Sequence, residues 1–392
     1  MSQNTPFSHR SFKPKPIRRG MALVYVLVMM TTLIGICSLA LDYAHMQVVN
    51  EQLQNATDAA ARAAVQQLPN GTSAATSAAT TVATENTVDD QSISSSQVTV
   101  QLLKWISPTN YTVVSSATSA NAVKVSISDS TPYFFATVLG FHTYLASQSS
   151  TAEEIIQTST QYVSTFSNPW LAGEPTGTEA SQPDPGFKGQ GVNKEHPWEY
   201  DVAGPNGEYD SAGEPYASPV LAGITVTPGA TITLSNVTGQ GNNDFTNSSE
   251  YDATGNASGY EANYDDAASN GVAEHGIADV TMPINAVNAV FLGNSVPDST
   301  AAPATLDFST QVERDYTAGS NNGVTLNGQF APQPKQVFYV GNGLTSTGKP
   351  ESFVVPAGAT RLYFGTMDGW EWSNNSGGFT VTMTQTSIAI VQ

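Results

Sequence analysis

The sequence predicts an N-terminal transmembrane helix, then a small α+β domain, then a C-terminal all-β domain of the jelly-roll or β-sandwich class. Three observations predict this order. Residues 21–41 hold no charged side chain, and residues 42–165 mix helical with strand-like segments. From residue 169 to residue 392, short apolar runs alternate with turns that contain Gly and Pro. We therefore expect a basic tail at 1–20, a membrane span and two exported domains.

The apolar run Met21–Leu41 (MALVYVLVMMTTLIGICSLAL) has the length of a membrane-spanning helix. At about 1.5 Å of rise per residue it covers roughly the 30 Å hydrocarbon core of a bilayer. Residues 1–20 carry five Lys or Arg and no acid, whereas the whole chain has a net charge of −19. The positive-inside rule therefore predicts a cytoplasmic N-terminus and an exported remainder. A cleaved signal peptide is the alternative, although Leu41-Asp42-Tyr43 does not resemble its small-residue cleavage site.

Composition and motifs exclude several function classes. An acidic body argues against nucleic-acid binding, which needs clustered Lys and Arg. The single cysteine, Cys37, lies inside the span, so the exported part has no disulfide. The chain has neither a His-Glu-x-x-His nor a Gly-x-Ser-x-Gly motif, and its five histidines are scattered. We therefore expect a protein that is not an enzyme.

The first exported domain is predicted from its helix formers and its alternating strands. The spanning helix should continue to Leu68, because Asp42–Leu68 has no Gly or Pro and has Ala-rich faces for close packing. Pro69-Asn70-Gly71 should end it, and a second helix is expected at 72–86. Strands are expected at 98–103, 111–114, 122–127 and 143–154, with a short helix at 132–141. Within that helix, the aromatic side chains expected in the core are those of Tyr133, Phe134 and Phe135.

The second exported domain is predicted to be a sandwich of short strands. Residues 168–213 are rich in Pro, Gly, Glu and Asp, and residues 239–271 form a long polar loop. Apolar runs of strand length are separated by Gly/Pro turns, which is typical of a β-sandwich or jelly roll. The expected strands lie at 220–226, 230–237, 286–292, 336–340, 352–355, 361–365 and 379–383.

The N-terminal segments resemble a known family. Arg18-Arg19-Gly20, Leu41-Asp42-Tyr43 after the span, and the run QLQNATDAAA at 52–61 are similar to the N-terminal region of Tad pilus-assembly TadG-like proteins, over about residues 18–165. The resemblance implies a single-pass protein of the bacterial inner membrane, periplasmic in its bulk, with pilus-assembly proteins as partners. Arg-Arg-Gly before an apolar helix is also similar to a prepilin leader. Prepilin processing usually needs Glu where this chain has Tyr25, which argues against a pilin subunit.

One loop concentrates oxygen donors. Between two predicted strands, Asp368, Glu371, Asn374 and Asn375 fall within eight positions. Hard cations such as Ca²⁺ bind six to eight oxygen ligands from carboxylates, amides and carbonyls. The loop therefore predicts a calcium site. The alternative is an ordinary Asx-rich turn between the strands of a hairpin.

The same segment, DGWEWSNNSGGF, resembles the calcium-and-sugar loop of the PA-IL-like galactophilic lectins, with weaker similarity over about residues 169–390. The spacing from Asp to Asn is one residue shorter here, and His275 stands where the lectins carry Gln. The resemblance implies a jelly roll that binds a glycan through calcium. The implied metal ligands are the side chains of Asp368, Asn374 and Asn375. A backbone carbonyl near Glu371 and another near Asn243 would complete the set. The implied carbohydrate contacts are Asp368, Gly369, Trp370, Asn374 and His275.

Together these observations predict a membrane-anchored, exported binding protein of a pilus or surface-assembly system, with a calcium-dependent, carbohydrate-binding C-terminal domain. The alternative is a structural pilus-assembly component, or a pseudopilin, whose β-domain makes protein–protein contacts.

Overall fold

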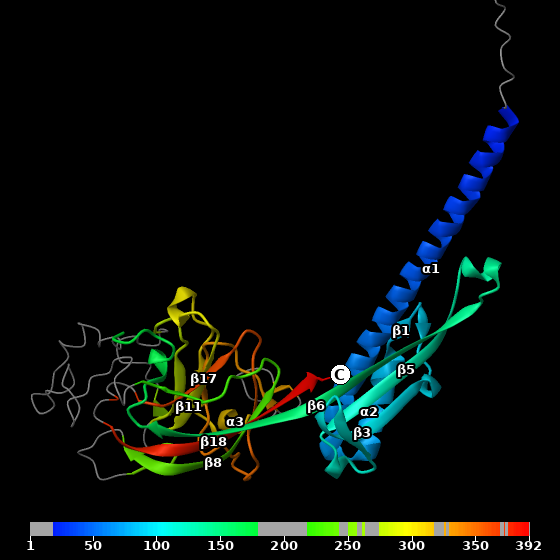
Figure 1. Cartoon of the computed structure of the whole chain (residues 1–392). Coiled ribbons are helices and arrows are strands. Elements are labelled where there is room, and N and C mark those ends of the chain that lie inside the picture. Colours follow the sequence, from blue (N-terminus) through cyan, green and yellow to red (C-terminus); the bar gives the residue numbers. More distant parts are fainter. Residues whose placement is uncertain are drawn as a thin grey trace, which may run out of the picture. The chain divides into compact units, whose positions relative to one another are not determined.

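The described part of the chain begins with one long helix and continues, after a second helix, into sheets (Figure 1). This computed structural model describes residues 19–178, 218–242, 250–256, 261–262, 274–316, 325–326, 329–368, 372 and 375–391. The predicted fold class is confirmed: a long apolar helix is followed by a sheet-rich remainder consistent with a β-sandwich. By length and composition, the helix from Met21 to Gln66 could cross a membrane, although a signal sequence can meet the same criteria.

The chain divides into two compact units. Unit 1 comprises Met1–Glu153 together with Ile390–Gln392, and unit 2 comprises Glu154–Ala389. Unit 2 is therefore inserted, in sequence, between two parts of unit 1. The domain limits expected from the sequence, 42–165 and 169–392, stay a prediction.

Two helices pack against each other in unit 1. Helix α1 runs over Arg19–Gln66 and α2 over Thr72–Glu85. In α1, Ala56, Ala60 and Ala64 recur every four residues and are buried, as are Ala75, Ala79 and Ala83 in α2. Side chains four apart share one face of a helix, and the small alanine methyl lets two helix backbones come close. The Ala-rich face expected from the sequence is therefore the contact face.

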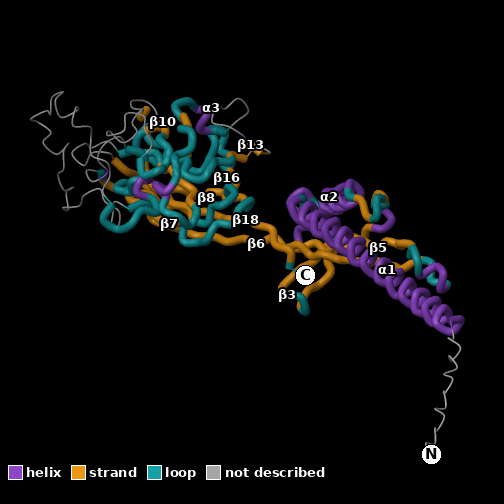
Figure 2. The backbone as a smooth tube through the Cα atoms, turned by 90° about the horizontal axis from the view of Figure 1, so that it is seen from above, coloured by secondary structure: helices purple, strands orange, loops and turns teal. Residues whose placement is uncertain are grey.

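An antiparallel sheet completes unit 1, in the order β6-β5-β3-β4 (Figure 2). Val123, Val125 and Ile127 of β5 are fully buried, whereas Lys124 and Ser126 between them are half-buried. This alternation was expected for a half-buried strand. The strands are β1 (Thr87–Val88), β2 (Gln91–Ser92), β3 (Val98–Ser107), β4 (Asn110–Val114), β5 (Ala122–Pro132) and β6 (Thr143–Ser164), whose later residues lie in unit 2.

The connection between β5 and β6 differs from the sequence-based expectation. Instead of a helix over 132–141, the chain forms one 3-10 turn, Ala136–Leu139, which ends at Gly140 in the left-handed conformation. The expectation that the three aromatic side chains lie in the core is wrong for Phe134, which is 59% exposed, and for Phe135, which is 43% exposed, whereas Tyr133 is half-buried. Three successive N–H groups, those of residues 134–136, donate to the side chain of Asp42 in α1, and the helical turn begins only at the last of these residues.

Unit 2 is built from two main sheets. One has the order β13-β14-β16-β8-β18-β6 and the other the order β15-β11-β17-β7, with a small third sheet β12-β10-β9. Among the described residues, unit 2 contains α3 (Gln311–Arg314) and the strands β7 (Val220–Leu221), β8 (Thr231–Asn242), β9 (Glu261–Ala262), β10 (Val280–Pro283), β11 (Val287–Leu292), β12 (Leu306–Asp307), β13 (Thr325–Leu326), β14 (Gln329–Phe330), β15 (Val337–Tyr339), β16 (Ser352–Val354), β17 (Arg361–Thr366) and β18 (Ser376–Ile390).

One hydrophobic core joins the two main sheets of unit 2. It includes Ile232 and Val381 from the first sheet and Phe338 and Phe364 from the second. Strand β11 is buried at every position, as expected for a central strand. The strand expected at 220–226 is shorter, since only Val220–Leu221 pairs and Gly223 adopts a positive φ of 77°.

Candidate functional site

The predicted calcium loop joins the two main sheets of unit 2. Strand β17 belongs to the four-stranded sheet, and β18 pairs with β8 in the other. The alternative of a turn between hairpin strands is therefore wrong, because these strands do not pair. Asp368 lies at the start of the connection and Asn375 at its end, and both side chains are buried. Of the other predicted site residues, Asn243, Gly369, Trp370, Glu371 and Asn374 lie outside the described residues.

Asn375 has a structural role at the end of this connection. Its side-chain Nδ2 donates to the carbonyl oxygen of Thr165 at 2.8 Å, and Thr366 Oγ1 donates to the same oxygen at 2.8 Å. Trp372, almost fully buried, donates from its indole nitrogen to the carbonyl of Thr366 at 2.9 Å and packs edge-on against Trp170. The Oδ1 atom of Asn375 is buried without a hydrogen-bond partner among the described residues. The loop ends are thus fixed, and one buried amide oxygen remains available there.

His275 occupies a tight turn between Glu274 and Ile277, whose backbones exchange hydrogen bonds of 3.1 and 2.8 Å. Both turn residues have a positive φ, 46° at His275 and 71° at Gly276. The His275 Nε2 atom lies 3.3 Å from a carboxylate oxygen of Glu274. This carboxylate pairing gives His275 a local partner that the lectin resemblance did not imply. Within the described ranges, no group of three or more His, Cys, Asp or Glu is arranged to hold a metal ion.

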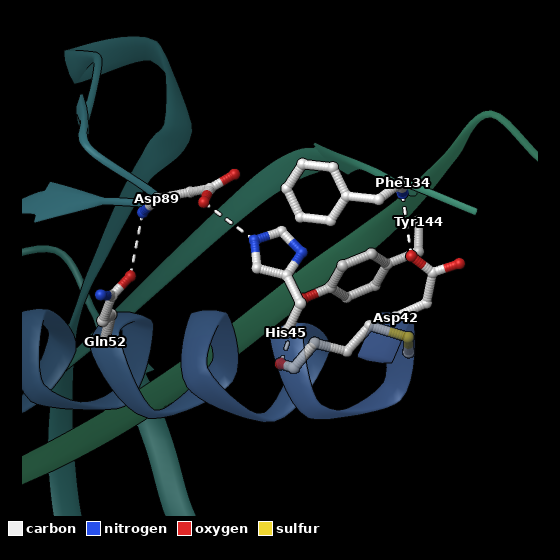
Figure 3. A network of polar contacts seen from close by, with 7 residues as sticks. Asp42, His45, Gln52, Asp89, Phe134 and Tyr144 are labelled. Carbon is white, nitrogen blue, oxygen red and sulfur yellow. Dashed lines mark hydrogen bonds and ion pairs between the residues drawn. The ribbon is translucent and has the colours of Figure 1, made fainter. Parts of the chain in front are cut away.

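A second polar arrangement, in unit 1, was not predicted from the sequence. Asp42, the residue directly after the apolar run, is only 3% exposed. Its carboxylate accepts hydrogen bonds from the backbone N–H groups of Phe134 at 2.9 Å, Phe135 at 3.1 Å and Ala136 at 2.6 Å. Figure 3 shows the bond from Phe134. Three successive amides of the β5–β6 connection therefore bind one carboxylate. We call this arrangement the Asp42 clamp.

The Asp42 clamp stabilises the ionised form of the Asp42 carboxylate. Burial by itself raises the pKa of Asp42, but the three backbone hydrogen bonds and the nearby His45 lower it by more, so the net pKa lies below its ordinary value. Hydrogen bonds to an ionised acceptor are roughly twice as strong as those between neutral groups. The carboxylate thus satisfies amides that would otherwise lack partners.

His45, one helical turn further along α1, extends the network. Its Nε2 atom lies 2.8 Å from a carboxylate oxygen of Asp89, and its ring lies 4.7 Å from that of Phe134 (Figure 3). Asp89 and Asp90 have positive φ values of 51° and 59° and form the two-residue turn between β1 and β2. The backbone N–H of Asp89 donates to the side chain of Gln52 at 2.9 Å. The β1–β2 turn is therefore held to the same stretch of α1.

Two further contacts set the register between α1 and the β5–β6 hairpin. Gln148 donates to Asn50 at 3.3 Å, and the Tyr144 hydroxyl donates to the carbonyl of Met46 at 3.2 Å. Going toward the hairpin tip, the partners on α1 move from residue 50 to 46 to 42. The tip therefore points toward the apolar N-terminal part of α1 (Figure 1). The network has a structural role, because it holds α1, the β1–β2 turn and the β5–β6 hairpin together. Among its residues, no nucleophile lies next to a base.

Two family models match this part of the chain. Residues 20–67 match a model described as putative Flp pilus-assembly TadE/G-like, and residues 58–153 match one described as putative Tad-like Flp pilus-assembly. Residues 20–153 are therefore similar to Tad pilus-assembly proteins. No curated protein and no solved structure matches the chain.

The clamp connects the two Tad-like segments. Asp42 and His45 lie in the TadE/G-like segment, whereas Asp89, Phe134 and Tyr144 lie in the second one. One signal in the sequence could have identified Asp42: it is the first acidic residue after the apolar run. Its partners could not be found in this way, because they are backbone amides far along the chain.

Proposed function

We propose that the chain is a membrane-anchored structural component of a Tad-type pilus-assembly system. Residues 21–41 cross the bacterial inner membrane, the basic tail is cytoplasmic, and both units lie on the periplasmic side. One observation carries the proposal: residues 21–41 of α1 are exposed, apart from the half-buried Ser38, whereas from Asp42 onward one face of the helix is buried, at Asp42, Val49 and Leu53. A helix that is apolar and exposed before Asp42 and packed on one face after it suits a bilayer on one side of the boundary and a folded domain on the other.

Helix α1 is long enough for both roles. Its residues from Asp42 to Gln66 extend about 37 Å beyond the span at ~1.5 Å per residue. Val49, Leu53 and Ala56 on this part are buried against the rest of unit 1. The anchor and the folded unit thus share one continuous helix, which transmits position from the membrane to the domain without a flexible linker.

The test is a topology and fractionation experiment on the full chain. A reporter that is active only after export, fused after Gln392, should be active, and the same reporter placed before Met1 should be inactive. The protein should pellet with membranes and resist extraction by high salt. A soluble product that begins near Asp42 would show cleavage of a signal peptide and would contradict the retained anchor.

A second function is proposed for unit 2, calcium-dependent binding of a carbohydrate at the β17–β18 connection. Two observations support this function. Asp368 and Asn375 are buried at the two ends of the connection, and the side-chain oxygen of Asn375 accepts no hydrogen bond from the described residues. Asp368 would supply a carboxylate, and Glu371, Asn374 and Asn243 would supply amide or carbonyl oxygens. With so few charged ligands, the affinity should fall in the weak range of about 10⁻⁴–10⁻³ M.

Calcium titration with a glycan screen tests this second function. At ~100 times the dissociation constant, a metal that binds only the folded state adds about 2.7 kcal/mol of apparent stability. Asp368→Ala should abolish this gain, whereas Asp298→Asn, which alters an exposed carboxylate of the same unit, should retain it. Equal melting in chelator and in excess calcium would exclude the metal site. Unit 2 would then be a β-domain for protein–protein contacts.

A further inference from the structure

The tip of the β5–β6 hairpin exposes a dense group of large apolar side chains. Val138 is 87% and Leu139 64% exposed, and Phe134 and Phe135 beside them are also exposed. Phe141 and Leu145 complete the group, which we call the apolar tip. Contiguous exposed apolar surface of this kind marks a site of interaction with a membrane or another protein.

The apolar tip carries no charge. Between Pro132 and Leu145 there is no Asp, Glu, Lys or Arg, and the one titratable group besides the tyrosines is His142. Transfer of the tip out of water therefore requires no dehydration of a permanent charge, which is the largest cost of entering a bilayer.

The backbone of the tip is also prepared for an environment with little water. Three backbone N–H groups of the tip donate to the Asp42 carboxylate. The N–H groups of Tyr133, Val138, Gly140 and Phe141 donate to carbonyl oxygens within the hairpin at 3.0–3.1 Å. Unpaired backbone groups are the main obstacle to placing irregular chain near lipid. The tip largely avoids this obstacle, because its amides already have partners.

The position of the tip identifies its partner. The clamp holds it beside Asp42, directly after the last residue of the apolar run, and the hairpin points toward that run (Figures 1 and 3). Leu39, Leu41 and Tyr43 of α1 are exposed at the same level. The apolar surface of the span and that of the tip are therefore neighbours. Tyr, present here as Tyr43, is one of the side chains enriched at this level, where the hydrocarbon meets the headgroups.

We propose that the apolar tip inserts into the interfacial layer of the membrane that α1 crosses, as a second membrane contact of unit 1. A single helix is free to tilt and to rotate in a bilayer, and its orientation is set by its anchors at the interface. With the tip inserted, α1 and the hairpin hold unit 1 at two points, which fixes its rotation about the helix axis. Asp42 is the positioning residue of this contact, since it links the tip to the end of the span.

The experiment uses the full chain in phosphatidylcholine vesicles and an environment-sensitive fluorophore on single cysteines. Three positions are labelled: the native Cys37 in the span, Leu139→Cys in the tip, and Val113→Cys as the matched control, the last two in a Cys37→Ser background. Val113 is 60% exposed, close to the 64% of Leu139. It pairs with Leu103, which pairs with Ala122, at the end of the sheet far from the tip. Lipids with a spin label high on the acyl chain serve as quenchers.

We expect blue-shifted, quenched emission at Cys37 and at Leu139→Cys, and water-like, unquenched emission at Val113→Cys. Adding Asp42→Ala should reduce quenching at Leu139→Cys and leave that at Cys37 unchanged. Quenching at Cys37 with none at Leu139→Cys would overturn the proposal and leave the anchor intact. Blue-shifted emission at Leu139→Cys that the spin-labelled lipids do not quench would indicate contact with a protein partner or a second copy. This result would also overturn the proposal. No quenching at either position would refute the anchor and the tip together.

Discussion

Asp42 accepts a hydrogen bond from the backbone N–H of Phe134 at 2.9 Å, although the two residues are 92 positions apart in the chain. The contact joins the end of the apolar run to the tip of a β-hairpin. It therefore couples the local stability of that tip to a single carboxylate, and this coupling can be measured.

Replacing Asp42 with Asn should loosen the hairpin tip. The amide of Asn has one acceptor oxygen and no charge, so it cannot replace the bonds to three N–H groups. We expect hydrogen exchange at Phe134, Phe135 and Ala136 to become faster by about tenfold or more. Asp90→Asn is the matched control, because this exposed turn residue keeps a left-handed conformation that Asn tolerates. Unchanged exchange in Asp42→Asn would contradict the clamp.

Acid should release the same clamp. The pKa of Asp42 is lower in the folded protein than its ordinary value of 3.8. The stabilisation is therefore fully present above that value and is lost as pH falls through the lower, folded-state pKa. Exchange at the three amides, corrected for intrinsic rates, should be independent of pH above 5 or so and rise steeply in stronger acid. In Asp42→Asn this acid-dependent rise should disappear, and its persistence would assign the effect to another group.

Asn375→Ala should destabilise unit 2 whether or not calcium is present. The substitution removes a buried donor to Thr165 and leaves a space in the packed connection. Loss of a buried hydrogen bond of this kind costs about 1–3 kcal/mol. Thermal unfolding should report it as a fall of roughly 2–4 °C per kcal/mol for a unit of this size. Asn236→Ala, at an exposed position of β8, should change stability by no more than about 0.5 kcal/mol.

Glu351→Gln should stabilise unit 2 at neutral pH. Glu351 is almost completely buried, and neither of its carboxylate oxygens has a hydrogen-bond partner among the described residues. Burial, with a contribution from Asp315, raises the pKa of Glu351 well above its ordinary value of 4.5. The unfolded chain releases this proton at lower pH than the folded one, so stability falls as pH rises above 4.5. Denaturant titrations should show a smaller fall in Glu351→Gln than in the wild type, while the exposed Glu250→Gln should match the wild type.

The helices and most strands could be predicted because their patterns are local. Met21–Leu41 is recognisable from length alone, and the alternation in β5 reports one buried face. The second half of β6 was missed for a physical reason. Its residues from Ile155 to Tyr162 are mostly exposed or half-buried, so they show no apolar alternation that would mark a strand.

The candidate sites were harder to predict. The concentration of Asp and Asn at 368–375 is visible in the sequence, but that the connection crosses between two sheets is a property of the whole fold. Phe134 and Phe135 were expected in the core because apolar side chains are usually buried. Their exposure depends on the contact with Asp42, which no local pattern records.

The return of the chain to unit 1 sets an order of assembly. The backbone N–H of Val391 donates to Thr151 at 2.8 Å, and its side chain packs against the cluster formed by Leu103, Trp105 and Ala122. A ribosome works from the N-terminus, so unit 1 receives this last segment only after all of residues 154–389 have been made. Unit 1 is thus completed last, and a chain that stalls within unit 2 leaves unit 1 with an incomplete sheet edge that a protease can recognise.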